Sequence, residues 1–250
     1  MPRFFLPELD LPEEKIPSEE IFLRGEEAFH LSVSLRSRIG DEVILCNARG
    51  MEFLCRISSI SGGKKDPVVA LECVSVRQGE SEPEVFVTLF QGMPKGKKTD
   101  SILQKCTELG VSKVVFVYSD HCVPTWDGED KKNARYERIV LEAAKQCGRG
   151  KLVQVDVAKN LESAMEEMKK SDLSFACYEK ESEKSLKELL SNKNYRSISF
   201  FIGPEGGISP REAELLEQNK IPTVTLGKRI LRTETAASAV LSMILYENEL

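Results

Sequence analysis

From about residue 84 to its end, the chain alternates short apolar runs with segments of helical period. Between the runs, apolar residues recur at the spacing of Ile102, Leu103, Cys106 and Leu109, which is typical of one helix face. Parallel neighbouring strands need a crossover connection, which is usually a helix. The alternation therefore predicts an α/β fold, a parallel sheet with helices on both faces. The expected strands are 85–90, 114–117, 152–157, 173–178, 197–202 and 221–226.

Local signals place the ends of several helices. Asp100 and Asn160 are expected to cap helix amino ends, and Ser182 is expected to begin a short charged helix. Segment 209–212 (Ser-Pro-Arg-Glu) has the form of a capping box with proline at the first helical position. A helix over roughly 130–147 and a last helix near the end of the chain complete the expected set.

Residues 1–75 have a different pattern, in which short strand-like runs are separated by turn residues. Several short strands with such turns are typical of a small β-barrel. Residues 76–83 are polar, contain glycine and proline, and show no apolar period, so they are expected to link this domain to a second one at 84–250. The strand-like runs of the first domain are Glu42–Cys46, Phe53–Ile57 and Val68–Val74.

Two glycine-bearing loops near the end of the chain are the best candidates for a binding site. Gly203–Gly207 follows the run 197–202, and Leu226–Ala237 follows the run 221–226. Both loops would lie at the carboxyl ends of strands, where α/β sheets usually bind ligands. Glycines without Cβ let the backbone approach a flat ligand such as adenine, while Pro204 restricts the turn. From the residues alone, a tight strand-to-helix turn without a ligand remains an equally good interpretation of the first loop.

Several other enzyme classes lack their sequence signals here. Gly92 and Gly96 are separated by three residues, where a phosphate-binding loop has four, and Lys98 stands where its hydroxyl should be. The chain has no G-x-G-x-x-G after the first strand and no G-x-S-x-G. An NTPase, a dinucleotide-binding enzyme and a serine hydrolase are therefore disfavoured. Lys95, Lys97 and Lys98 are candidates for an electrostatic edge that binds RNA, and a solvated loop is an equally good interpretation.

The seven cysteines are scattered, odd in number and never in a C-x-x-C pair. This pattern predicts reduced thiols in a cytoplasmic protein, without a disulfide framework or a metal site. His121 and Cys122 have no evident third partner and are expected to be structural. No transmembrane span and no signal peptide are expected. The formal net charge of −5 disfavours a generally basic nucleic-acid binder, but charge can gather locally. The candidate basic segment contains Lys131, Lys132, Arg135, Arg138, Lys145, Arg149 and Lys151.

Beyond the two glycine loops, further segments occur in a distinctive order and spacing: Met1–Phe5, His30–Asp41, Thr107–Val111, Glu137-Arg138 and Glu142–Arg149. Together these segments resemble the RsmE family of small-subunit ribosomal RNA uracil-N3 methyltransferases, which are knotted SPOUT-type enzymes. The resemblance covers nearly the whole chain. The family often has serine at the position of Cys147, which is an exchange between small residues.

The resemblance implies a fold and a function. It implies a C-terminal SPOUT-type trefoil knot, which general rules of chain topology would not suggest, and an N-terminal PUA-like RNA-binding barrel. The cofactor would be S-adenosylmethionine, and the substrate would be N3 of a uridine in 16S rRNA of the small ribosomal subunit. Family members are homodimers with the knot at the interface, which implies a homodimer in the cytoplasm without a metal or a membrane.

The resemblance also assigns residues to sites. Arg232 is a candidate to position the target base or a phosphate, and Glu205 or Glu234 is a candidate to accept a proton or to hold the cofactor. A salt-bridged surface arginine and a helix-start charge are the plain alternatives for Arg232 and Glu234. The implied cofactor-binding residues are Tyr178, Phe201, Ile202, Gly203, Pro204, Glu205, Gly206, Leu226, Gly227, Ile230, Leu231, Thr235 and Ala236. The implied RNA-binding residues are Arg3, Arg36, Arg38, Lys95, Lys97 and Arg149.

Two other functions stay open at this point. The first is another knotted methyltransferase that acts on tRNA or on a ribose 2′-hydroxyl, which the RsmE-like start of the chain disfavours. The second is a noncatalytic RNA-binding protein with a decayed cofactor site, which the intact glycine loops disfavour. Binding of S-adenosylmethionine separates the enzymes from the noncatalytic protein.

Overall fold

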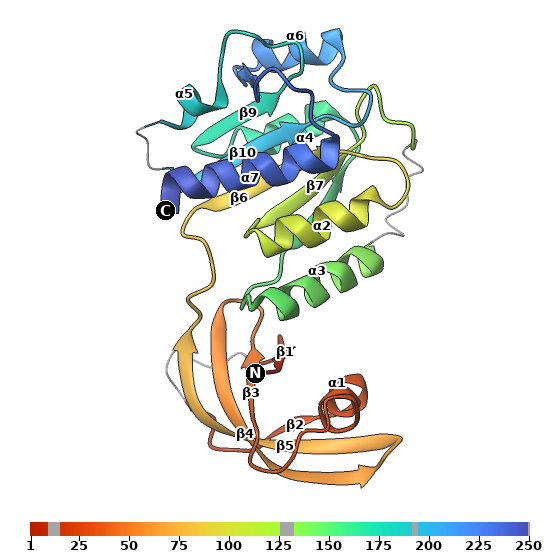
Figure 1. Ribbon diagram of the computed structural model, residues 1–250, viewed down its shortest axis with the longest axis vertical. Coiled ribbons are helices and arrows are strands. Elements are labelled where there is room, and N and C mark those ends of the chain that lie inside the picture. The colour runs from red at the N-terminus through yellow and green to blue at the C-terminus, as the bar shows by residue number, and fades with distance from the viewer. Residues whose placement is uncertain (10–15, 126–132, 192–194, 250) are drawn as a thin grey trace. The chain divides into compact units, whose positions relative to one another are not determined.

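The computed structural model divides into two compact units, and each unit has a hydrophobic core of its own. Unit 1 is Met1–Glu82 with Ala144–Leu152, and unit 2 is Pro83–Ala143 with Val153–Leu250 (Figure 1). The short segment Ala144–Leu152 thus belongs to unit 1 although it comes much later in the sequence. The structure describes residues 1–9, 16–125, 133–191 and 195–249.

Unit 1 is built on a five-stranded sheet with the strand order β1-β3-β4-β5-β2. β4 and β5 form a long antiparallel hairpin, and β1 pairs with β3 in parallel. Helix α1 (Gly25–Phe29) continues into a π-helical turn (His30–Ser34), and together they bury Ala28 and Leu31 in the core of this unit. The strands are β1 (Arg3–Phe5), β2 (Ile21–Leu23), β3 (Glu42–Cys46), β4 (Met51–Gly63) and β5 (Asp66–Gln78).

The predicted β character of this region is confirmed, but two strands are longer than expected. The run 42–46 is β3, whereas β4 and β5 have 13 residues each. The register of the hairpin shifts between Leu54 and Cys55 and again between Ile57 and Ser59. Such β-bulges interrupt the strict alternation of inward and outward residues. The second interruption follows Ile57, where the expected run in β4 ends.

Unit 2 contains a six-stranded sheet in which each strand pairs in parallel with its neighbours, with the order β11-β9-β10-β6-β7-β8. The predicted parallel sheet is therefore confirmed. β10 lies between β6 and β9, and it is the strand that leads into the first glycine loop. The strands are β6 (Phe86–Gly92), β7 (Lys113–Val117), β8 (Gln154–Ala158), β9 (Leu173–Cys177), β10 (Ser197–Ile202) and β11 (Thr223–Val224).

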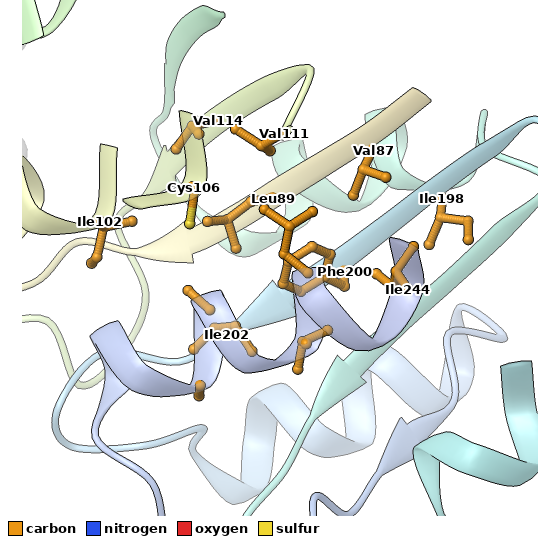
Figure 2. Close-up of a cluster of buried hydrophobic side chains, with 14 of the residues drawn as sticks. Val87, Leu89, Ile102, Cys106, Val111, Val114, Ile198, Phe200, Ile202 and Ile244 are labelled. Atoms are coloured by element: carbon orange, nitrogen blue, oxygen red, sulfur yellow. The ribbon is translucent and has the colours of Figure 1, made fainter. Parts of the chain in front are cut away.

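Helices cover both faces of this sheet, as predicted for parallel strands. One cluster joins the sheet to α2, α3, α5 and α7, and a second cluster joins the other face to α4 and α6. Figure 2 shows Leu89 of β6, Phe200 of β10 and Ile244 of α7 pointing toward one another in the first cluster. The helices are α2 (Lys98–Glu108), α3 (Asn133–Cys147), α4 (Leu161–Met168), α5 (Leu186–Leu190), α6 (Pro210–Gln218) and α7 (Thr233–Glu249).

The helix-start signals were right in two places and wrong in two others. The Asn160 side chain caps α4, and the capping box begun by Ser209 starts α6, as predicted. Asp100 is not a cap, because α2 already begins at Lys98 and places Asp100 in its first turn. Ser182 does not begin α5, because the Glu181 carboxylate accepts hydrogen bonds from the next three backbone amides and holds them in a turn.

The last expected strand is shorter than the apolar run that predicts it. β11 comprises only Thr223 and Val224, which pair with β9. Ile221 lies in the core beside Leu216 of α6. It is apolar because it is buried there, although it is not part of a strand. Among the described residues, no helix is both long and apolar enough to cross a membrane.

Candidate active site

A cavity of about 820 Å³ lies at the carboxyl ends of β9, β10 and β11 in unit 2. Its wall is formed by the segment after β9 and by the two glycine loops, which the parallel sheet brings to the same edge. This is the position at which α/β sheets usually hold ligands. The predicted residues that line it are Tyr178, Ile202, Gly203, Pro204, Glu205, Gly206, Leu226, Gly227, Ile230, Leu231, Arg232 and Ala236.

Three predicted site residues do not line the cavity. Phe201 is fully buried on the opposite face of β10, because successive side chains of a strand point to opposite faces. Thr235 is exposed on the first turn of α7. Glu234 lies beside it and reaches the cavity wall indirectly, through an ion pair with the cavity-lining Lys98. The two predicted glycine loops also contribute Gly207, Lys228, Arg229 and Thr233 to the cavity. The lining residues outside these loops that were not assigned to the cofactor are Lys98, Cys177, Glu179, Glu181, Ser182, Val224 and Thr225.

A buried glutamine connects the two glycine loops to the sheet. Gln91 is fully buried near the end of β6, and its Nε2 donates to Thr233 Oγ1 at 2.7 Å and to Gly92 O at 3.0 Å. The Thr233 hydroxyl in turn donates to Gly203 O at 2.7 Å. Buried hydrogen bonds such as those of Gln91 Nε2 and the Thr233 hydroxyl fix one arrangement of the segments they join. Three segments distant in sequence thus meet at one hydrogen-bonded point beside the cavity.

The loop after β7 packs against the first glycine loop through His121. His121 Nδ1 lies 2.8 Å from Gly206 O, so the neutral Nδ1–H tautomer or the protonated ring can donate to this carbonyl. A Cβ at Gly206 would lie 2.7 Å from His121 Cβ, so only glycine permits this approach. His121 therefore has the structural position that the sequence predicted, and it contacts the loop that forms the cavity.

The neighbouring Asp120 attaches the same loop to the start of α6. Its carboxylate accepts hydrogen bonds from Ser209 Oγ at 2.6 Å and from Arg211 Nη2 at 2.7 Å. Its backbone amide donates to Glu212 Oε1 at 2.9 Å. The hydrogen bonds from Arg211 and Ser209 lower the pKa of Asp120 to about 2. The amino end of α6, which follows the first glycine loop, is thereby held to the loop after β7.

Asp120→Asn is expected to make the protein less stable, with a loss that depends on pH. Because the folded-state pKa of Asp120 is depressed, its stabilising effect is present above the ordinary pKa of 3.8 and is lost as pH falls through about 2. Urea-unfolding midpoints should therefore differ by a constant amount above pH 4 and converge below it. The control is Asp66→Asn, in the β4–β5 hairpin. If the urea-unfolding midpoints of wild type and Asp120→Asn differed by the same amount at every pH, the lowered pKa of Asp120 would be contradicted.

The cavity wall carries both signs of charge. Lys228, Arg229 and Arg232 are exposed on the second glycine loop, while Glu179 is exposed after β9. Burial opposes the ionisation of Glu205, but hydrogen bonds from its own backbone, the Lys98 ammonium and another backbone amide outweigh it, so the pKa of Glu205 is lowered. A site with carboxylates, cations and an apolar wall suits a ligand that is itself partly apolar and zwitterionic.

The predicted RNA-binding residues have different environments. In unit 2, Lys95 and Lys97 are exposed between β6 and α2. In unit 1, Arg36 and Arg38 are exposed, and Arg36 has a left-handed backbone with φ of 57°. All four side chains are accessible to an RNA backbone.

Arg3 and Arg149, by contrast, are engaged inside unit 1. Arg3 Nη1 lies 2.6 Å from the buried carboxylate of Glu52. Arg149 is 4% exposed and lies 2.8 Å from Glu82. These ion pairs favour structural roles for both arginines. Of the candidate basic segment, Lys131 and Lys132 lie outside the described residues.

The composition of the cavity fits S-adenosylmethionine. Its volume lies within the range of about 300–1,000 Å³ that is typical of small-molecule sites. Leu226, Ile230 and Leu231 offer apolar surface for a purine ring, and the glycine backbone offers amides and carbonyls for its polar edge. Glu179 offers a carboxylate for ribose hydroxyls or for an ammonium group, and Arg232 offers a cation for a carboxylate. In the part of the chain that is described, no cluster of three or more metal-ligating side chains occurs.

Two family models match this chain. One describes an RNA methyltransferase domain and matches residues 81–245, and the other describes an RNA methyltransferase PUA domain and matches residues 23–66. A relative from Bacillus subtilis (strain 168), named ribosomal RNA small subunit methyltransferase E, is 32% identical over 258 aligned residues. The alignment covers 100% of this chain and 98% of the relative.

Solved structures show the same architecture. A ribosomal RNA small subunit methyltransferase E from Neisseria gonorrhoeae, bound to S-adenosylmethionine, superposes with a TM-score of 0.83 and 27% identity, covering 99% of this chain and 98% of that one. A methyltransferase from Legionella pneumophila with the same bound cofactor gives a TM-score of 0.82 and 28% identity, covering 98% of this chain and 97% of that one. Both similarities extend over the two units.

Proposed function

Because this chain belongs to the RNA methyltransferase family that includes the ribosomal RNA small subunit methyltransferases E, we propose that it methylates N3 of a uridine in 16S rRNA with S-adenosylmethionine as methyl donor. The observation that carries the proposal is the cavity of about 820 Å³ at the carboxyl ends of β9, β10 and β11. Relatives of similar fold carry S-adenosylmethionine. The activity is therefore that of a transferase, and the cofactor supplies an already activated methyl group.

The chain's own residues have three tasks in this reaction. The glycine loops would hold the cofactor, with Gly203–Gly206 and Leu226–Leu231 as the segments available to its apolar part and Glu179 available to its polar groups. Arg232 is exposed at the cavity wall, where it can orient the target base or an adjoining phosphate. The N3 atom would form a bond to the methyl carbon as the S–C bond of the sulfonium breaks and S-adenosylhomocysteine is left, while the N3 proton would go to a carboxylate of the wall or to water. Alignment of donor and acceptor supplies most of the rate enhancement.

The remaining parts of the proposal concern domain roles and assembly. Residues 1–75 would bind RNA as a PUA-like module, and 84–250 would form the knotted methyltransferase domain. Of the expected linker 76–83, residues 76–78 belong to β5 and Glu82 belongs to unit 1. Exposed Arg36 and Arg38 would contact phosphates from the first module, and Lys95 and Lys97 from the second domain. The trefoil knot, the homodimer and the cytoplasmic location remain expectations from the family resemblance.

Arg232→Ala is expected to lower kcat/KM for ribosomal RNA by about 10- to 100-fold, the equivalent of a lost charge-assisted hydrogen bond of about 1.5–3 kcal/mol. The measurement uses labelled S-adenosylmethionine and small ribosomal subunits that lack the modification, followed by digestion and identification of the labelled nucleoside. The wild-type protein should yield 3-methyluridine.

The matched control is Arg196→Ala. Arg196 is also exposed, but it immediately precedes β10 at the end of the strand opposite to the cavity. This variant should methylate like the wild type. A labelled 2′-O-methyl nucleoside, or label in tRNA only, would contradict the proposed substrate and keep the enzyme class. Undetectable binding of S-adenosylmethionine by the folded protein would contradict the enzymatic function itself.

A further inference from the structure

A single lysine connects the two glycine loops at the cavity wall. Lys98 Nζ, in the first turn of α2, lies 3.1 Å from Glu205 Oε1 and 3.4 Å from Glu234 Oε2. Glu205 belongs to the first glycine loop. Glu234 belongs to the second, Leu226–Ala237, where this segment enters the first turn of α7. Three segments that are far apart in sequence therefore meet at one ammonium group.

Further contacts hold Glu205 and Glu234 in place beside Lys98. Glu205 also accepts a hydrogen bond from the backbone amide of Lys95 at 3.1 Å. Glu234 Oε2 is buried, and among the described residues Lys98 is the cation within ion-pair distance of it. The amino end of α7 further favours the charge of Glu234. The hydrogen bond that Lys98 donates to Glu205 and the nearby negative charges raise the pKa of Lys98, so this lysine stays charged at neutral pH.

We propose that Lys98 is a positioning residue that holds the carboxylates of Glu205 and Glu234 together and thereby fixes the two glycine loops in the geometry that binds the cofactor. The proposal rests on the proposed function, because these loops are the ones assigned to S-adenosylmethionine. It also gives the two glutamates a structural task as ionised partners of Lys98. The buried Gln91 joins the same loops from the sheet, so the two loops are held together by hydrogen bonds inside the protein and by an ionic contact at the cavity wall.

Removing the ammonium group should leave two carboxylates facing each other without a cation between them. Like charges at short distance repel, and the repulsion ends when one carboxylate is protonated. The loss of affinity for S-adenosylmethionine in a Lys98→Met variant should therefore be largest at high pH and smaller at low pH. Other charged groups on the cavity wall are present in both proteins and cancel in the comparison: Glu179, Glu181, Lys228, Arg229 and Arg232.

The test is calorimetric titration of S-adenosylmethionine from pH 5 to pH 8. Lys98→Met should raise Kd about fivefold at pH 8, consistent with two partly exposed ion pairs, and the ratio to wild type should shrink towards pH 5. Lys98→Arg, which keeps the charge, should stay close to wild type. Adding Glu205→Gln to Lys98→Met should recover part of the affinity, because it removes the repulsion. Lys105→Met, an exposed lysine on the same helix, should leave Kd unchanged.

A second measurement does not depend on the cofactor. Urea unfolding of Lys98→Met, Glu205→Gln and the double variant should show coupling between the two positions. No coupling, together with a Kd ratio that is the same at every pH, would overturn the role of Lys98. A second outcome separates the two proposals. If the four proteins show coupling but the wild type neither binds S-adenosylmethionine nor methylates RNA, the proposed function is overturned and the ionic contact stays supported.

Discussion

Gly92→Ala is expected to lower both the stability of the protein and its affinity for S-adenosylmethionine. A Cβ at Gly92 would lie closer than 3.0 Å to the backbone nitrogen and the Cδ of Pro204, and 2.9 Å from the carbonyl carbon of Gly203. These are backbone and ring atoms, which cannot move aside as a flexible side chain can. Overpacking of this kind typically costs about 1–3 kcal/mol. Because the displaced atoms belong to the first glycine loop, Kd should rise by about tenfold or more, the equivalent of about 1.4 kcal/mol.

Urea unfolding gives the change in stability, and calorimetric titration gives the change in Kd. The control is Gly63→Ala, since a Cβ there meets no atom within 4 Å and the residue has no left-handed backbone. Gly63→Ala should differ from wild type by less than about 0.5 kcal/mol. If Gly92→Ala bound S-adenosylmethionine as tightly as wild type, the close packing of β6 against the first glycine loop would not matter for the site.

The parallel sheet was predictable because its signals are local. An apolar run, a helical period and a cap occur within a few residues of one another, so the order of strands and helices could be inferred from 84 onward. The start of α5 was predicted wrongly because a side chain binds the backbone amides there. Glu181 takes the amides that follow it, so α5 begins at Leu186, capped by Ser185, and not at Ser182. A sequence pattern does not show which of several neighbouring polar side chains will accept hydrogen bonds from the backbone amides.

The candidate site was predictable only where it is contiguous. The two glycine loops were found because each lies in one stretch of sequence, and both line the cavity. Gln91 and Lys98 were missed as parts of it, because they come from β6 and α2, more than a hundred residues before the loops they contact. One signal was available for Gln91, a polar residue at the end of an otherwise apolar strand-like run. Its partners, however, follow from the tertiary fold alone.

Glu82→Ala is expected to have the largest effect on stability. The Glu82 carboxylate lies 2.8 Å from Arg149 Nη2, and the two side chains are only 7% and 5% exposed. The carboxylate also accepts hydrogen bonds from the backbone amides of Gly150 at 3.0 Å and Lys151 at 2.9 Å. Glu82 therefore attaches the segment Ala144–Leu152 to the rest of unit 1. Removing one partner of a buried ion pair typically costs about 3–5 kcal/mol, because the other charge stays buried without it.

Urea unfolding should show this loss, and hydrogen exchange should show faster exchange at the amides of Gly150 and Lys151. Glu82→Gln should cost less, because its amide oxygen can still accept from the backbone. Burial opposes the ionisation of Glu82, but the hydrogen bond and charge of Arg149 outweigh it, so the pKa of Glu82 is lowered. Its stabilising effect is thus present above the ordinary pKa of a glutamate and is lost as pH falls below that value.

The matched control is Glu80→Ala, an exposed glutamate two positions earlier, which should change stability by less than about 0.5 kcal/mol. The experiment also separates two roles of Arg149. If its guanidinium holds unit 1 together, Glu82→Ala destabilises the protein and does not tighten RNA binding. If its guanidinium binds RNA instead, removing the competing carboxylate should leave the stability near that of the control. RNA binding should then become tighter and depend more steeply on salt concentration. The buried geometry of the pair leads us to expect the first result.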